Sequence, residues 1–203
     1  MITIACVLKS GGEYAPRHVY QLQTGFVRHA KVPFNFVCLS DLPGNGYSVI
    51  PLKHNWKGWW SKLELFRPGL FDGPVFFADL DTIVVGNVDE LLTGHCFTVL
   101  ENFWSTQRIG SGLMAWDCDL SAIYEKFSEA PERYMAEGVT TENWGDQGFI
   151  RFNSPIEPER FQRKHPGKVV SYKFHCKAGV PPEASIVCFH GKPRPWLTEL
   201  WGK

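Results

Sequence analysis

Two aspartates interrupt an apolar run near the middle of the chain, and their spacing is the feature most able to do chemistry. Asp79 and Asp81 lie in the segment V-F-F-A-D-L-D-T-I-V-V, residues 75–85. Alternate side chains of an extended strand share a side, so we expect both carboxylates to face one way and Leu80 to face the core. Two such close negative charges resist ionisation without a cation between them, and their oxygens suit a hard divalent metal. The pair predicts a metal site; the alternative is a solvated strand end.

A second pair with the same spacing shows that spacing alone is weak evidence. Asp117-Cys118-Asp119 follows another apolar run, but it leads directly into a helical pattern over residues 120–128. Acidic side chains are typical of helix N-caps and first turns, so we expect this pair to cap that helix. The first pair has no helix to cap. In open α/β sheets, ligands also collect at the carboxyl ends of strands, where Asp79 is expected to lie.

The elements that must position these acids alternate between strand and helix patterns. Up to residue 80, the strand patterns are residues 2–8, 34–39, 47–52 and 75–78, and the helical ones are 16–30 and 61–66. Beyond residue 80, strand patterns at 96–100, 112–116, 169–172 and 185–189 are interleaved with helical ones at 120–128 and 146–152. Continuous apolar runs are typical of strands covered on both faces, as in parallel sheets. We predict one α/β domain over residues 1–203, with a mixed, mostly parallel central sheet flanked by helices.

The charge balance, the lengths of the apolar runs and the cysteine spacing indicate which binding partners and which cellular location to expect. The 203 residues carry 21 basic and 21 acidic side chains, so no excess positive charge favours binding to nucleic acid. No apolar run approaches the roughly 20 residues of a membrane span, and the apolar N-terminal run has no basic leader typical of a signal peptide. The six cysteines are widely scattered and form no C-x-x-C pair. We expect reduced thiols, a cytoplasmic protein, no integral membrane segment and no nucleic-acid partner.

Five blocks resemble one known group of enzymes, and together they span nearly the whole chain. They are W-S-K-L (60–63), F-A-D-L-D-T (77–82) with N-V-D-E-L (87–91), G-S-G-L (110–113), G-D-Q-G (145–148) and F-H-G-K-P-R-P-W (189–196). With these blocks the sequence resembles the retaining glycosyltransferases of the GT-A fold, most closely family 8, the group that includes glycogenin and bacterial galactosyltransferases.

The resemblance implies a manganese ion, or magnesium, that is held by Asp79 and Asp81 and bridges the diphosphate of a UDP-sugar donor. Further donor-binding positions follow from the same blocks: Leu8, Ser10 and Tyr14 at the nucleotide base, Leu80 between the two acids, and Lys62, Ser111, Gly112, Gly191, Lys192 and Arg194. Lys62 and either Lys192 or Arg194 would add positive charge at the diphosphate. The ordinary alternative for these basic residues is a solvated surface position. For Gly112, close approach to a ligand and tight packing both remain open.

The pattern departs from the family at two positions. The family's third metal ligand is a histidine, and Cys188 occupies its place. His190 lies two residues later, on the same side of a strand, and imidazole suits a manganese site better than soft thiolate, so we expect His190 to be the third ligand. Gly110 stands where the family often has an asparagine that touches the donor, so the resemblance does not imply this contact with the donor here.

Asp146 and Gln147 are the catalytic residues that the resemblance implies. Asp146 would bind sugar hydroxyls, and Gln147 would lie near the anomeric carbon and stabilise an oxocarbenium-like transition state. The alternative is that Asp146 caps a helix and that Gln147 is exposed. Trp56, Trp59, Trp60, Trp104 and Trp144 could stack on a sugar or a base, although buried aromatic residues are usually core.

The predicted activity is transfer of a sugar from a UDP-sugar to a carbohydrate or other hydroxyl acceptor, with retention of configuration. Two alternatives remain. A haloacid-dehalogenase-like phosphatase would need Asp-x-Asp-x-Thr, whereas here Thr82 follows Asp81 directly. An inactive sugar-nucleotide-binding module would keep the fold, and the substituted third ligand makes this conceivable.

Overall fold

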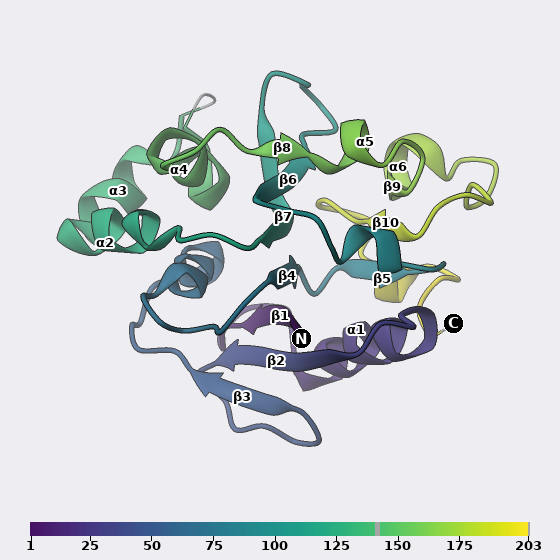
Figure 1. The fold of residues 1–203 in the computed structure, drawn as a ribbon, viewed down its shortest axis with the longest axis horizontal. Helices are drawn as coiled ribbons and strands as arrows, with labels where there is room; N and C mark the ends of the chain where they lie inside the picture. Colours follow the sequence, from purple (N-terminus) through teal and green to yellow (C-terminus); the bar gives the residue numbers. More distant parts are fainter. Residues whose placement is uncertain (141–142, 203) are drawn as a thin grey trace.

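The computed structural model describes residues 1–140 and 143–202, and two sheets lie within these ranges (Figure 1). In spatial order, the seven-stranded sheet contains β3 (Ser48–Pro51), β2 (Phe34–Ser40), β1 (Ile2–Leu8), β4 (Val75–Ala78), β7 (Ile109–Trp116), β6 (Phe97–Glu101) and β8 (Glu159–Arg160). The pairs from β3 to β4 are parallel, β7 is antiparallel to both β4 and β6, and β8 is parallel to β6. The sheet is therefore mixed and mostly parallel, as predicted.

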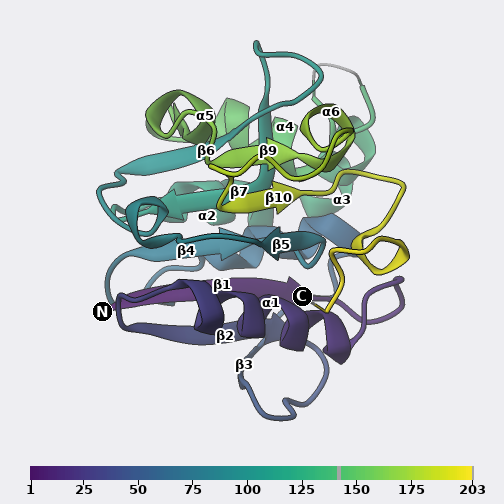
Figure 2. The ribbon, with the colours of Figure 1, turned by 90° about the vertical axis from the view of Figure 1, so that its right-hand side faces the viewer.

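A smaller sheet packs beside the large one on the side of α1 (Figure 2). It contains β5 (Thr82–Val84), β10 (Ile186–Cys188) and β9 (Val169–Ser171), with β10 antiparallel to β5 and parallel to β9. The sequence patterns predicted strands at β9 and β10, but they did not predict β5 as a separate strand. The chain therefore passes from one sheet to the other between Ala78 and Thr82, at the acidic pair.

Helices cover both faces of the large sheet, which explains why β4 is buried along its whole length (Figure 1). One face carries α1 (Pro16–His29), α5 (Phe161–Lys164) and α6 (Tyr172–His175), and the other carries η1 (Gly58–Phe66), α2 (Ser121–Glu129), α3 (Pro131–Glu137) and α4 (Gly145–Asn153). Two short 3₁₀ turns, η2 (Asp89–Leu91) and η3 (Pro195–Leu197), complete the elements.

In helix α1, the apolar residues of the sequence pattern form the face that packs in the core. Its buried residues are His18, Val19, Leu22, Gly25 and Phe26, a spacing that places them along one stripe of the helix. A Cβ on Gly25 would lie 3.1 Å from Cβ of Val84, so glycine lets the helix approach β5 closely. The segment predicted as a helix at 61–66 is instead a 3₁₀ helix that begins at Gly58, and it ends before Pro68.

The predictions for the second acidic pair and for the cysteines can be compared with the structure. Asp119 Oδ1 accepts a hydrogen bond from the backbone N–H of Ser121, the first residue of α2. Leu120 occupies the N-cap position, and neither acid lies in the first turn, so the capping prediction holds only for this one contact of Asp119. All six cysteines are free. In the described residues, no helix is long and apolar enough to cross a membrane.

His95 is a buried histidine whose environment favours the neutral ring. Its Nε2–H donates to the carbonyl oxygen of Leu91 at 2.9 Å, and its ring packs against Phe161. Burial, aided by the positive charge of Lys164, lowers the pKa of His95 from 6.5 to about 4. The folded protein therefore binds this proton only at lower pH than the unfolded chain does.

We expect this difference to make stability fall as pH decreases from about 6.5 to about 4. In this range the unfolded state binds more protons than the folded state, so protonation favours unfolding, by up to about 3 kcal/mol below pH 4. Urea unfolding at several pH values would measure the slope. His95→Gln should flatten it, whereas His29→Gln, a change at a half-exposed position, should not. Equal slopes in the wild type and in His95→Gln would contradict this assignment.

Candidate active site

The acidic pair lies in a turn and not on an extended strand, which corrects the sequence-based geometry. The backbone N–H of Thr82 donates to the carbonyl oxygen of Asp79 at 3.0 Å and closes a four-residue turn after β4. Leu80 is 4% exposed and packs in the core, as expected. The two carboxylates thus come together through the turn that joins the two sheets, and strand alternation is not the reason.

Lys62 is the centre of a buried ion-pair cluster. Its Nζ lies 2.8 Å from Asp146 Oδ2 and 3.3 Å from Asp79 Oδ2, and it donates to Ser111 Oγ at 3.1 Å. Burial alone would lower the pKa of Lys62, but the charges of Asp146 and Asp79 outweigh it and raise this pKa above its ordinary value. Lys62 is therefore a permanent cation that joins η1, the β4 exit, β7 and α4.

The element that carries Lys62 is itself anchored by a buried carboxylate. Glu64 is fully buried in η1, and its two oxygens accept the backbone N–H groups of Lys53 and His54. Arg67 donates to the same carboxylate at 3.1 Å. These hydrogen bonds hold η1 in place, and they therefore also fix the position from which the Lys62 side chain extends.

Asp81 has a second set of partners. Tyr14 donates its hydroxyl to Asp81 Oδ2 at 2.9 Å, and Arg194 Nη1 donates to the same oxygen at 2.8 Å. Burial, followed by repulsion from Asp79, raises the pKa of Asp81 to about 7, although Tyr14 and Arg194 oppose this shift. Burial and the charge of Asp146 likewise raise the pKa of Asp79, against the effect of Lys62. The pair therefore gains from any further positive charge placed beside it.

The predicted nucleotide end of the site lies at the ends of β1 and β2. Ser10 donates both its backbone N–H and its hydroxyl to Asp41, which follows β2, and Lys9 also contacts this carboxylate. The hydrogen bonds from Lys9 and Ser10 outweigh burial and lower the pKa of Asp41 to about 2. Sequence reasoning missed Asp41, although a polar residue directly after a strand at the same sheet edge as Ser10 was a usable signal.

Arg194 closes the site from the C-terminal segment. Its second guanidinium nitrogen contacts Glu13, another residue that sequence reasoning missed, and Trp196 packs edge-on against Tyr14. Gly191 and Lys192 are exposed, and Lys192 makes none of the described ion pairs. Of the two basic candidates for the diphosphate, the structure brings Arg194 to the acidic pair.

Ser111 and Gly112 are residues of β7, and they lie beside Asp79. The carbonyl oxygen of Gly112 accepts the backbone N–H of Asp79 at 2.9 Å, and a Cβ on Gly112 would lie 3.2 Å from Asp79 Oδ2. The close approach that this glycine permits is therefore to the carboxylate of Asp79. Any larger residue here would press on the acidic pair.

The start of α4 confirms a helix at Asp146 and Gln147 but not the capping alternative. Trp144 occupies the N-cap position, and Asp146 is 5% exposed and paired with Lys62. Gln147 follows it and is half-buried. Asp146 thus joins the cluster that also contains Asp79.

His190 does not join the two aspartates. Its Nε2 lies 2.7 Å from Ser171 Oγ, and its ring stacks on Phe103 and Phe174. Within residues 1–140 and 143–202, no group of three or more His, Cys, Asp and Glu side chains is arranged to hold a metal ion. The expected triple of Asp79, Asp81 and His190 is therefore not assembled, because His190 lies beyond the end of β10 and turns into an aromatic cluster.

Cys188, at the position that the family fills with histidine, lies nearer to the acids. It pairs with Thr82 across β10 and β5 and is 5% exposed. Burial, together with the charges of Asp81 and Asp79, raises the pKa of this thiol well above its ordinary value. A soft thiolate suits manganese or magnesium less well than imidazole or oxygen ligands do, so Cys188 is a poor replacement for the histidine.

The donor set that remains suits a hard cation with two protein ligands. The described side-chain contacts of Asp79 and Asp81 all involve Oδ2, so Oδ1 of each carboxylate has no described hydrogen bond that would compete with a cation. Magnesium and manganese accept one or two carboxylates and complete their coordination with water and substrate phosphates. Asp79 and Asp81 thus fit such an ion without a third side chain.

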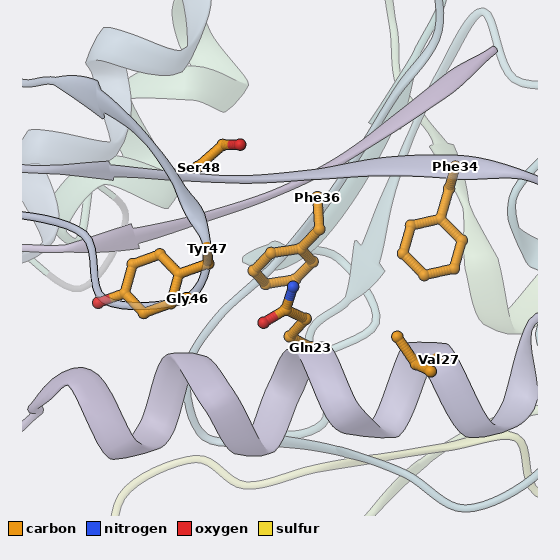
Figure 3. Close-up of a pocket in the computed structure, with 7 residues that line it drawn as sticks. All are labelled: Gln23, Val27, Phe34, Phe36, Gly46, Tyr47 and Ser48. Atoms are coloured by element: carbon orange, nitrogen blue, oxygen red, sulfur yellow. The ribbon is translucent and has the colours of Figure 1, made fainter.

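A pocket elsewhere contains none of the predicted site residues (Figure 3). It has a volume of about 580 Å³ and lies between α1 and the β2–β3 edge. Gln23 points from α1 toward Phe36, and Val27, Phe34 and Tyr47 lie around it. Its lining has no charged side chain, in contrast to the cluster around Asp79.

Comparisons with known proteins agree with this architecture at the level of fold. No protein-family model matches the chain, and no curated protein does. Among solved structures, the galactosyltransferase LgtC, solved with donor and acceptor sugar analogs, aligns with a TM-score of 0.65 and 13% identity over 98% of this chain and 92% of LgtC. The glycosyltransferase GlyE of Streptococcus pneumoniae TIGR4 aligns with a TM-score of 0.63 and 12% identity over 96% of this chain.

The chain spans 55% of the GlyE chain and 47% of WbbM, a bifunctional glycosyltransferase that aligns with a TM-score of 0.59 and 12% identity. These similarities confirm the α/β GT-A fold that the resemblance predicted. Sequence identities this low support a shared fold, but they do not support shared substrates.

Removal of the Lys62 cation should destabilise the protein. We expect Lys62→Met to leave the buried Asp146 and the partly exposed Asp79 without their cation, and to lower the free energy of unfolding by about 3 kcal/mol. Urea unfolding at pH 7 measures this. The double variant Lys62→Met/Asp146→Asn should lose less than the single variant, because one of the two unpaired charges is gone.

Lys126→Met is the matched control, since Lys126 pairs with Glu129 on the surface. This change should cost no more than about 0.5 kcal/mol. If the control loses as much stability as Lys62→Met, the central role of the Lys62 cluster is wrong.

Proposed function

We propose that the protein is a glycosyltransferase that moves a sugar from a metal-bound UDP-sugar to a carbohydrate or other hydroxyl acceptor. One observation carries this proposal: Lys62 links the carboxylate of Asp79, at the exit of β4, to Asp146, at the start of α4. A diphosphate beside Asp79 and Asp81 would then have its attached sugar beside Asp146 and Gln147. The similarity to glycosyltransferases of the same fold supports this reading.

Each residue has a defined role in this proposal. Asp79 and Asp81 would hold manganese or magnesium, which acts as a Lewis acid on the leaving diphosphate. Arg194 and Lys62 would add positive charge where the diphosphate gains negative charge, and the Asp146 carboxylate would accept hydrogen bonds from sugar hydroxyls. Ser10 and Tyr14 lie where the nucleotide base and ribose would bind.

The transfer step conserves atoms and charge without a protein nucleophile. The acceptor oxygen attacks the anomeric carbon, the bond from that carbon to the phosphate oxygen breaks, and the acceptor proton passes to the departing phosphate oxygen. Attack on the face from which UDP leaves retains the anomeric configuration. Gln147 has an amide side chain, which is a poor nucleophile, and its dipole would stabilise the oxocarbenium-like transition state.

Retention of configuration and a cytoplasmic location stay predictions. Two other functions can be distinguished from sugar transfer by the reaction that the protein catalyses. An inactive module would bind UDP with manganese but would not hydrolyse a UDP-sugar. A phosphatase would cleave simple phosphate esters with magnesium and without a nucleotide. Its nucleophile would be Asp79, whose Oδ2 here contacts Lys62.

The acidic pair should be required for metal-dependent nucleotide binding. We expect Asp81→Asn to weaken manganese-dependent UDP binding by about tenfold or more, because the ion loses a charged ligand. The fold should persist, which circular dichroism can check. Calorimetry with and without manganese measures the affinity. Asp119→Asn, in the second D-x-D pair, is the control and should bind as the wild type does; unchanged manganese-dependent affinity in Asp81→Asn would exclude the site.

Gln147 should matter more for transfer than for donor binding. We expect Gln147→Ala to lower the rate of UDP release from a UDP-sugar while the affinity for UDP stays within about twofold of the wild-type value. A coupled assay for UDP, together with calorimetry, separates the two effects. Equal losses in both measurements would make Gln147 a binding residue only.

A further inference from the structure

Two half-exposed tryptophans lie next to each other at the catalytic cluster. Trp59 and Trp144 are each 50% exposed, and their ring centroids are 6.3 Å apart with planes tilted by 40°. Exposed indole surface is unfavourable in water, and contiguous exposed apolar surface marks binding sites more often than single exposed residues do. The two rings form one bent aromatic surface, which we call the Trp59–Trp144 platform.

The platform is attached to the same elements as the central ion pair. Trp59 lies in η1, three residues before Lys62, and Trp144 is the N-cap of α4, two residues before Asp146. The 2.8 Å contact between Lys62 Nζ and Asp146 Oδ2 fixes η1 against α4. The two rings therefore keep their position relative to the cluster.

Gly145 lets the two elements come close enough for this arrangement. Its φ of 60° lies in the left-handed region, and a Cβ there would lie 2.9 Å from Trp59 Nε1. A side chain at residue 145 would therefore push the Trp59 ring away from α4. The glycine has a specific steric reason for its place between Trp144 and Asp146.

The contacts of the cluster run in a series from the nucleotide end to the platform. Tyr14 and Arg194 contact Asp81, Lys62 joins Asp79 to Asp146, and the Trp59 ring occupies the space that a side chain at residue 145 would need. A UDP-sugar bound along this series would have its base at the Tyr14 end and its sugar near Asp146. The acceptor would bind next to the donor sugar, at the end of this series of contacts where Trp59 and Trp144 lie.

We propose that the Trp59–Trp144 platform is the acceptor subsite and that it binds a pyranose ring of a carbohydrate. The C–H face of a pyranose packs on the electron-rich face of an indole, while the hydroxyl groups at the ring edge stay available for attack and hydrogen bonding. This proposal rests on the proposed function and narrows the acceptor from any hydroxyl compound to a sugar.

Another exposed aromatic cluster lacks this placement. Trp104 is 71% exposed and packs edge-on against Phe174, beside Lys173. Its described contacts lead to His190 and not to Lys62 or Asp146. Trp104 therefore provides a matched control, an exposed tryptophan outside the catalytic cluster.

The test is a glycan array probed with the whole protein in the presence of manganese and UDP, followed by affinity measurements with the strongest glycan bound. We expect Trp59→Leu and Trp144→Leu to weaken this binding by about tenfold each, and Trp59→Phe to retain most of it, since a ring remains for stacking. Trp104→Leu should bind the glycan as the wild type does. A thermal shift with manganese and UDP shows whether each variant is folded and binds nucleotide.

Several results would overturn the proposal. They are a wild-type protein that binds UDP but no glycan on the array, glycan binding that survives in both leucine variants, and an equal loss in Trp104→Leu. Failure of the proposed function looks different, because the protein would show no manganese-dependent UDP binding. Glycan binding through the two tryptophans would then show a carbohydrate-binding surface and would overturn its assignment as an acceptor subsite.

Discussion

The buried ammonium of Lys62 is the interaction on which the site depends. It lies between the carboxylates of Asp79 and Asp146, which come from segments that are far apart in sequence and lie on different elements. A lone charge in this position would pay a large desolvation cost, and two carboxylates without it would repel each other. Each member therefore helps to position the others at the point where η1, β7, α4 and the end of β4 meet.

The two carboxylates of the acidic pair, Asp79 and Asp81, repel each other. Their charges are already offset in part by Lys62, Arg194 and the hydroxyl of Tyr14, yet the pKa of Asp81 stays raised to about 7. A divalent ion would relieve the remaining repulsion, and a diphosphate would then face three sources of positive charge. In the proposed function the same groups would serve two states, one in which they neutralise acids and one in which they bind phosphate.

The turn between β4 and β5 explains why the site lies where it does. At this turn the chain leaves the seven-stranded sheet and enters the three-stranded one, so both sheets end beside Asp79 and Asp81. The C-terminal segment can then reach Asp81 through Arg194, and β10 can place Cys188 behind the pair. The proposed donor site includes this junction, and the proposed acceptor site lies next to Asp146, which Lys62 joins to Asp79.

The sequence by itself determined the α/β alternation, the mostly parallel sheet and the segments that form the candidate site, because continuous apolar runs and motif blocks are local signals. Only the tertiary structure decided which groups meet. The pairing of Asp146 with Lys62, the choice of Arg194 over Lys192, the roles of Asp41 and Glu13, and the separation of His190 from the acids depend on contacts between distant segments. Local patterns hold no information on such contacts, since burial and charge balance are properties of the assembled chain.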